Sequence, residues 1–206
     1  MNKKLIISPH VDDDVLGCGG ILDSDCLVLY CGLDETGIKN RPSRQERIKE
    51  INDVVKVTGH KYNILDNLVN RYGKNKLIGE FEGVINEYQP DEIYLPHPSY
   101  NQDHVEVYES SMIALRPHDK NYFVKKIFIY EQPHMFFWDD NMLDFKPNYF
   151  VPIDIEKKIK VYKLMESQVR SYRSPEHLRA IGKLRGGQSN CNYAEAFKIM
   201  RWVNEK

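Results

Sequence analysis

The chain has 206 residues, of which 41% are hydrophobic and 29% are charged, enough apolar material for one domain of ordinary size. This balance excludes an intrinsically disordered chain, and no repeat of about 20–50 residues indicates a solenoid. With 29 basic and 30 acidic side chains the formal net charge is -1, so a nucleic-acid partner is not expected.

The N-terminus and the cysteines favour a cytoplasmic protein. The apolar run before Ser8 and Pro9 is too short for a signal-peptide core or a membrane span. The four cysteines form no C-x-x-C pair and no framework spacing, which favours reduced thiols. We therefore expect no membrane partner, while an oligomer stays possible.

In the first half of the chain, short apolar runs alternate with helical patterns. Strands are predicted at 4–8, 26–32, 61–65 and 92–95. Helical segments are predicted at 15–22, 43–59 and 77–88. Ser43 can cap the second of these helices, and Gly59 can end it.

The second half is less regular. A strand is predicted at 122–130, an aromatic loop at 131–151, a helix at 155–171 and a C-terminal helix at 194–203. No linker or low-complexity stretch divides the chain, so 1–206 is expected to be a single domain. Strands that alternate with helices predict an α/β, Rossmann-like domain with a mostly parallel central sheet flanked by helices.

The strongest chemical signal directly follows the first predicted strand. His10 precedes Asp12, Asp13 and Asp14, and three adjacent carboxylates repel one another unless a cation neutralises them. On an irregular turn, residues i and i+3 can point the same way, so His10 and Asp13 could bind one metal ion together. Asp12, facing elsewhere, would then be free to act as a base.

Two other interpretations of this run stay open at this point. An aspartate-rich turn is often a solvated helix N-cap that the helix dipole stabilises. The glycines within 17–20 could approach a bound phosphate, but the preceding carboxylates would repel it and no G-x-G-x-x-G pattern is present. We expect these glycines to allow close packing of a helix on the sheet.

A second polar cluster follows the strand predicted at 92–95. Because ligands of parallel sheets bind beyond the carboxyl ends of the strands, we expect this cluster to meet the first. His104 can complete a site of two histidines and one carboxylate, which suits catalytic zinc and also iron, with Asp103 in a supporting contact. His97, held between two prolines, is expected to be structural. The other histidines are expected on the surface or in packing: His60, His118, His134 and His177.

The run PHVDDDVLGCGG at 9–20 resembles the P-H-P-D-D-E-x-x-x-G-x-G-G signature of the PIG-L/LmbE-like zinc deacetylase family. Further fragments similar to the family follow in order along nearly the whole chain. They are Arg47-x-x-Glu50 with Thr58-Gly59, Leu65-Asp66, NQDH at 101–104, FKPN at 145–148, Ser167-Gln168, Arg185-Gly186 and YAEAF at 193–197.

The resemblance implies a Rossmann-like hydrolase that removes the N-acetyl group from a small amino-sugar substrate, commonly GlcNAc-linked. The zinc ligands of the family correspond to His10, Asp13 and His104, and its general base corresponds to Asp12. Arg47 and Asp66 match positions that contact sugar hydroxyls. Zn²⁺ is therefore the expected cofactor, while Fe²⁺ and other divalent ions stay open.

Three positions depart from the family pattern. Val11 replaces a proline, which removes no ligand. Asp14 replaces a glutamate, so a hydrogen bond behind the ligands can shift. Asn101 stands where the family generally has a histidine that stabilises the oxyanion or donates a proton; asparagine can donate a hydrogen bond but cannot shuttle a proton. Asp12 returning its own proton is the simplest substitute.

Plainer roles remain for several of these residues. Arg47 could pair with Glu50 on the same helix face, and Asp66 could belong to an ordinary turn. The aromatic residues Phe136–Trp138 could stack on a sugar or cover the site, although core packing is favoured. At the level of function, the alternatives are a zinc-dependent amidase acting on a non-sugar N-acyl amine and a catalytically silent sugar-binding module of the same fold.

Overall fold

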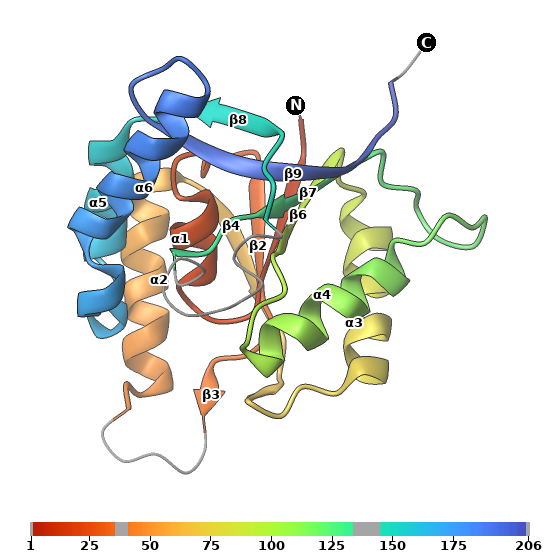
Figure 1. The fold of residues 1–206 in the computed structure, drawn as a ribbon. Helices are drawn as coiled ribbons and strands as arrows, with labels where there is room; N and C mark the ends of the chain where they lie inside the picture. Colours follow the sequence, from red (N-terminus) through yellow and green to blue (C-terminus); the bar gives the residue numbers. More distant parts are fainter. Residues whose placement is uncertain (1, 36–40, 134–144, 205–206) are drawn as a thin grey trace.

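A computed structural model describes residues 2–35, 41–133 and 145–204. A seven-stranded sheet runs through this part of the chain (Figure 1). In spatial order its strands are β4 (Lys61–Ile64), β2 (Cys26–Tyr30), β1 (Lys4–Ser8), β6 (Glu92–Pro96), β7 (Lys126–Tyr130), β9 (Ala194–Trp202) and β8 (Tyr149–Pro152). The first five are parallel, and β9 runs antiparallel to both neighbours. This is the predicted α/β, Rossmann-like architecture with a mostly parallel sheet.

Helices cover both faces of the sheet (Figure 1). One face carries α1 (Asp13–Cys18), α2 (Arg44–Thr58), α5 (Ile155–Lys163) and α6 (Pro175–Gln188), and the other carries α3 (Lys74–Tyr88) and α4 (Gln102–Ala114). Two short 3₁₀ turns, η3 (Glu166–Gln168) and η4 (Ser171–Arg173), connect α5 to α6. A small parallel pair of strands, β3 (Asp34–Glu35) and β5 (Leu68–Val69), lies apart from the main sheet.

The core consists of two apolar layers, one on each face of the sheet. The side chains of β1 alternate between them: Leu5 and Ile7 belong to the layer under α3 and α4, while Ile6 belongs to the layer that also contains residues of α1, α2 and α5. All three are fully buried. Because β1 is central and covered on both faces, its sequence is continuously apolar, which is why the strand could be predicted from the sequence.

Local signals in the first half of the chain predicted most of the observed elements, although α1 spans Asp13–Cys18 instead of 15–22 and the short strands β3 and β5 were not predicted. The strand predicted at 4–8 is β1, and the helix predicted at 43–59 is α2. Ser43 caps α2 through a capping box with Glu46, and Gly59 ends it in the left-handed conformation at φ 77°. Gly17, inside α1, allows close packing of this helix on the sheet, since a Cβ there would lie 2.2 Å from the Tyr130 ring.

Three predictions for the second half are wrong. The segment predicted as a C-terminal helix is the nine-residue strand β9. The helix predicted at 155–171 ends at Lys163, and η3 and η4 follow it. In the loop predicted at 131–151, β8 begins at Tyr149. Neither α4 nor α6 was predicted.

The error at β9 has a physical cause. Alanine and glutamate favour helices, but β9 lies between β7 and β8 and forms backbone ladders with both. These tertiary hydrogen bonds override the local helix preference. Its buried Glu195 is held in place because Gly20 N–H and Lys158 Nζ both donate to Oε1, at 2.7 and 2.6 Å.

Several expectations concern single segments. All four cysteines are free thiols. Within the described ranges, no helix combines the length and apolarity that crossing a bilayer requires. The aromatic residues Phe136–Trp138, considered above for stacking or packing, and His134 lie outside the described residues.

Candidate metal centre

The two polar clusters meet at the carboxyl ends of β1 and β6. These strands are neighbours in the sheet, and the chain order reverses between them, since β1 is followed on one side by β2 and on the other by β6. Such a switch point is where open α/β sheets bind ligands. His10 lies in the turn after β1, Asp13 begins α1, and His104 lies in the first turn of α4.

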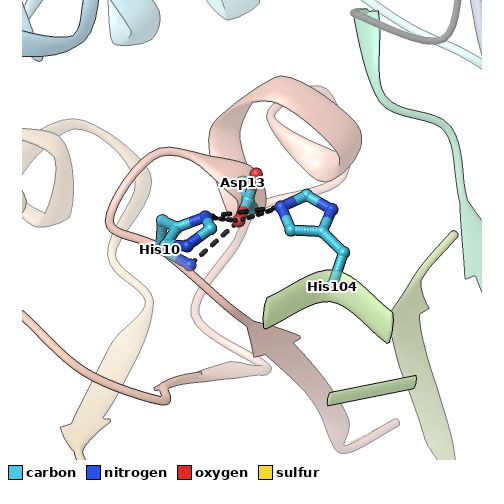
Figure 2. Close-up of side chains that lie close together, drawn as sticks. All are labelled: His10, Asp13 and His104. Carbon is cyan, nitrogen blue, oxygen red and sulfur yellow. Dashed lines mark hydrogen bonds and ion pairs between the residues drawn. The ribbon is translucent and has the colours of Figure 1, made fainter. Parts of the chain in front are cut away.

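The side chains of His10, Asp13 and His104 point toward one another (Figure 2). His10 Nδ1 lies 3.2 Å from Asp13 Oδ2, His104 Nε2 lies 3.2 Å from the same oxygen, and the two nitrogens are 3.3 Å apart. The three atoms form a nearly equilateral triangle. Asp13 and His104 are buried, whereas the side chain of His10 is partly exposed.

This triangle has the size of one face of a tetrahedral zinc site. Ligand atoms about 2.0–2.1 Å from a tetrahedral ion lie about 3.3–3.4 Å from one another. The observed separations of 3.2, 3.2 and 3.3 Å match this requirement. Two imidazole nitrogens and a carboxylate oxygen are also the donor set of open, catalytic zinc sites. The residues present therefore fit a divalent ion with a further coordination position open.

Asp103 fixes the orientation of His10 from behind. Its Oδ2 lies 3.0 Å from His10 Nε2 and also accepts a hydrogen bond of 2.7 Å from the backbone N–H of Asn70. An imidazole that binds a metal through one nitrogen commonly donates its other N–H to a carboxylate in this way. Asp103 is 1% exposed, so water does not compete for the contact.

The electrostatic environment of the triangle favours a cation. Burial alone would lower the pKa of His10, but hydrogen bonds with Asp103 and Asp13 outweigh burial and raise this pKa to about 10. Burial pushes the pKa of Asp13 upward, yet the neighbouring charges of His104 and His10 hold it well below its usual range. Positive charge is thus strongly stabilised at this position.

The three consecutive aspartates point in different directions. Asp13 faces the histidines, Asp12 forms an ion pair of 2.6 Å with Arg173, and Asp14 accepts a hydrogen bond of 3.0 Å from the Tyr30 hydroxyl. Burial raises the pKa of Asp14 to about 8 against the opposing effect of Tyr30. Arg173 therefore relieves part of the mutual repulsion, and the raised pKa of Asp14 favours its uncharged form, in addition to any cation at the triangle.

Asp12 does not fit the alternative of a solvated helix cap. It occupies the N-cap position of α1, but its side chain makes no capping hydrogen bond and is 3% exposed. Burial raises the pKa of Asp12, and the charge of Arg173 opposes this shift. The charge of Asp13 raises the pKa of Asp12 further, and the charge of His10 lowers it.

Asn101 lies next to His104 at the start of α4. Its Oδ1 caps the helix by accepting the Asp103 N–H at 2.9 Å. This contact uses the oxygen, so the side-chain nitrogen is the atom that can donate to a ligand. His97 is buried at the end of β6, where its ring packs edge-on against Phe145 at 5.2 Å between centroids. That packing agrees with the structural role expected for His97.

Arg47 and Asp66 lie in different surroundings. Arg47 is buried, donates to the Leu33 carbonyl and forms an ion pair of 3.2 Å with Glu35. The alternative partner Glu50 instead accepts hydrogen bonds from the backbone N–H and hydroxyl of Ser167, at 2.7 and 2.6 Å. Asp66 is exposed in the loop after β4.

Three contacts at the centre were not found from the sequence. Arg173 pairs with Asp12, the backbone of Asn70 donates to Asp103, and the Tyr72 hydroxyl donates to the Pro9 carbonyl at 2.6 Å. The arginine lies far along the chain from its partner, and a backbone donor has no residue signature. Only Asn70 offers a weak local signal, since asparagine tolerates its positive φ of 67°.

The C-terminal fragments that resemble the family make contacts with and within the sheet, of which the ion pairs are buried and the Asn148 contact is exposed. Arg185 forms a bidentate ion pair with Glu131, and Lys158 pairs with Glu195 at 2.6 Å. The Asn148 side chain accepts the Ile199 N–H at 2.8 Å and so supports β9. The two ion pairs thus attach α5 and α6 to the sheet.

Comparisons with known proteins agree with this geometry. The family profile described as "PIG-L: GlcNAc-PI de-N-acetylase" matches residues 5–115, a range that contains every site residue considered above from His10 to His104. A comparison with curated protein sequences finds no significant match.

Solved structures share the fold along almost the whole chain. The conserved protein TT1542 from Thermus thermophilus is 20% identical with a TM-score of 0.80, covering 100% of this chain and 98% of its own. The N,N'-diacetylchitobiose deacetylase from Pyrococcus horikoshii is 21% identical with a TM-score of 0.77, covering 97% and 84%. GalB, the 4-carboxy-2-hydroxymuconate hydratase from Pseudomonas putida, is 19% identical with a TM-score of 0.78, covering 100% and 99%.

Proposed function

This chain belongs to the PIG-L family of GlcNAc-PI de-N-acetylases, and we propose that it is a metal-dependent hydrolase that removes an N-acetyl group from an amino sugar. The observation that carries the proposal is the triangle of His10 Nδ1, Asp13 Oδ2 and His104 Nε2, whose sides of 3.2–3.3 Å suit a tetrahedral zinc ion. Zn²⁺ is the proposed cofactor, and Fe²⁺ would accept the same ligands.

Each residue of the centre has a proposed role. His10, Asp13 and His104 hold the ion, which supplies Lewis acidity: it polarises an amide carbonyl and lowers the pKa of water to about 7. Asp103 keeps His10 in the tautomer that presents Nδ1, because Asp103 Oδ2 accepts a hydrogen bond from the Nε2–H group. Asp14, which contacts Tyr30 rather than the triangle, supports the turn behind the ligands.

Asp12 is the proposed general base. Its carboxylate takes a proton from the attacking water while the new C–O bond forms at the acetyl carbon. The same proton then passes to the amine nitrogen as the C–N bond breaks, so that acetate and a free amine leave. Such positioned proton transfer contributes a rate factor on the order of 10²–10⁴. The Asn101 side-chain nitrogen is the proposed second donor to the carbonyl oxygen.

The amino-sugar assignment has two supports. The matched family is named for a de-N-acetylase of a GlcNAc compound, and a protein of the same fold is named for deacetylation of N,N'-diacetylchitobiose. Arg47 and Asp66 are the proposed contacts to sugar hydroxyls. A small-molecule substrate, a single domain over 1–206 and a cytoplasmic location complete this proposal.

The fold by itself does not select this reaction, because the hydratase GalB has the same fold at similar identity. An amidase acting on a non-sugar N-acyl amine would use the same centre with a different pocket. A silent sugar-binding module would keep the fold and lose turnover. What favours a deacetylase over the silent module is that the complete ligand triangle and Asp12 are present together.

A substrate panel tests the proposal. The purified chain is loaded with Zn²⁺ or, without oxygen, with Fe²⁺, and is incubated with N-acetyl amino sugars and with non-sugar N-acetyl amines. Release of amine and acetate in equal amounts from a sugar substrate is expected, and the Asp12→Asn variant is the matched control. Turnover only of non-sugar amides indicates the amidase, and bound metal without turnover of any amide indicates the silent module.

A further inference from the structure

Arg173 is the charged partner of Asp12. Its guanidinium Nη1 lies 2.6 Å from Asp12 Oδ2, and the two side chains are 13% and 3% exposed. Because water has little access to this partly buried pair, the charge of Arg173 acts on the Asp12 carboxylate with little screening. The ion pair therefore restrains the orientation of the Asp12 carboxylate.

Asp12 has little else to hold its side chain. Although it stands at the N-cap position of α1, its carboxylate makes no hydrogen bond to the backbone of that helix. Its neighbours Asp13 and Asp14 are each fixed by their own contacts, with the two histidines and with Tyr30. Within the described ranges Asp12 Oδ2 has no hydrogen-bond partner, and its ion pair with Arg173 is the contact that acts on it.

The backbone around Arg173 is itself well anchored. Arg173 ends η4, and the next residue, Ser174, caps α6 by accepting the His177 N–H. Earlier in the same connection, Ser167 is bonded twice to the buried Glu50 of α2. Both ends of the connection are thus attached to helices, so the arginine is presented to Asp12 from a fixed position.

We propose that Arg173 is a positioning residue that aims the Asp12 carboxylate for proton transfer. The inference rests on the proposed function, because it acts through Asp12. An arginine suits this role because its guanidinium stays charged at any physiological pH and so acts on the carboxylate throughout. A purely structural arginine would join η4 to α1 with no consequence specific to Asp12.

Kinetics distinguish the two roles. In Arg173→Met, kcat is expected to fall on the order of 10²-fold, as small misplacements of reacting groups do, with KM and bound metal little changed. Arg173→Lys is expected to recover part of the loss. In the Asp12→Asn background, Arg173→Met should cost nothing more, because the group it positions is already gone. Arg170→Met, an exposed arginine of the same connection, is the matched control and should keep wild-type kcat.

Two results would overturn the inference: an unchanged kcat in Arg173→Met, or an equal further loss when Arg173→Met is added to Asp12→Asn. A crystal structure of Arg173→Met gives a readout independent of turnover. The Asp12 carboxylate should leave its present orientation while His10, Asp13 and His104 stay in place, and an unmoved Asp12 contradicts the proposal. A wild-type chain that hydrolyses no amide would refute the proposed function. The orientation of Asp12 in the Arg173→Met crystal structure would still test whether Arg173 positions Asp12.

Discussion

Asp103 Oδ2 lies 3.0 Å from His10 Nε2, on the side of the imidazole opposite the nitrogen that faces Asp13 and His104. The same carboxylate oxygen accepts the Asn70 N–H at 2.7 Å. One acidic side chain thus connects the loop before α3 to the proposed metal ligand. This arrangement makes the affinity for metal depend on a residue outside the triangle.

Replacing Asp103 by alanine should weaken zinc binding about 10- to 100-fold, because His10 would lose the contact that sets its tautomer and orientation. Competition with a chromophoric chelator measures the affinity. Asp119→Ala, which removes an exposed aspartate beyond α4, is the control and should bind zinc as the wild type does. Equal affinities of the Asp103 and Asp119 variants would contradict the supporting role of Asp103.

Two variants should distinguish the role of the proposed base from the role of the metal ligands. Asp12→Asn should retain metal and lose a factor on the order of 10²–10⁴ in kcat, because it removes the proton acceptor and leaves the triangle intact. His104→Ala should lose the metal, since it removes one corner of the triangle. Metal content by atomic emission and amine release are measured on the same samples. A near-normal rate in Asp12→Asn would reject the base assignment.

Asp66 can be replaced to test sugar recognition without a change in the stability of the protein. Its side chain is exposed, so Asp66→Ala should leave the melting temperature unchanged. Loss of a hydrogen bond to a sugar hydroxyl should raise KM about 2- to 10-fold. Glu87→Ala, an exposed acid on α3, should change neither quantity. An unchanged KM in Asp66→Ala would assign Asp66 to turn formation alone.

His60 predicts a pH dependence of stability away from the metal centre. It is 1% exposed, its Nδ1 lies 2.6 Å from the Thr58 hydroxyl, and burial lowers its pKa from 6.5 to about 4. Below about pH 6.5 this histidine is protonated in the unfolded chain, whereas in the folded chain it stays neutral until the pH approaches 4. The free energy of unfolding contributed by His60 is therefore complete above that pH and is lost as the pH falls toward 4.

Urea unfolding measures this effect. Between about pH 7 and about pH 5 the wild type should lose about 2 kcal/mol more than His60→Gln, in line with about 1.4 kcal/mol for each pKa unit. The glutamine variant removes the titrating group and keeps a polar side chain. Parallel losses in the two proteins would show that His60 does not titrate differently in the folded state.

The parts of the fold that the sequence predicted well are those with local signals. β1 is a continuous apolar run, and α2 carries both a capping serine and a terminating glycine. β9 was mistaken for a helix because its backbone partners, β7 and β8, are distant in sequence. The missed helix α6 does have a start signal, Ser174 followed by Pro175 at the first helical position, which the apolar pattern alone did not reveal.

The same distinction applies to the site. His10, Asp13 and His104 could be brought together from the sequence because each follows the carboxyl end of a parallel strand, where the topology forces the loops to meet. The partner of Asp12 could not be predicted from the sequence. Arg173 reaches Asp12 from the connection between α5 and α6, and the path of this connection depends on tertiary packing. The contact between Arg47 and Glu35 could not be predicted either, because it depends on where β3 lies in the fold.

The most direct test of the central claim is an anomalous-scattering experiment on crystals grown with Zn²⁺. Difference maps from data collected on both sides of the zinc absorption edge identify the ion and its position. We expect a peak bonded to His10 Nδ1, Asp13 Oδ2 and His104 Nε2. A map without a peak at that triangle, or with an ion that His104 does not bind, would contradict that claim.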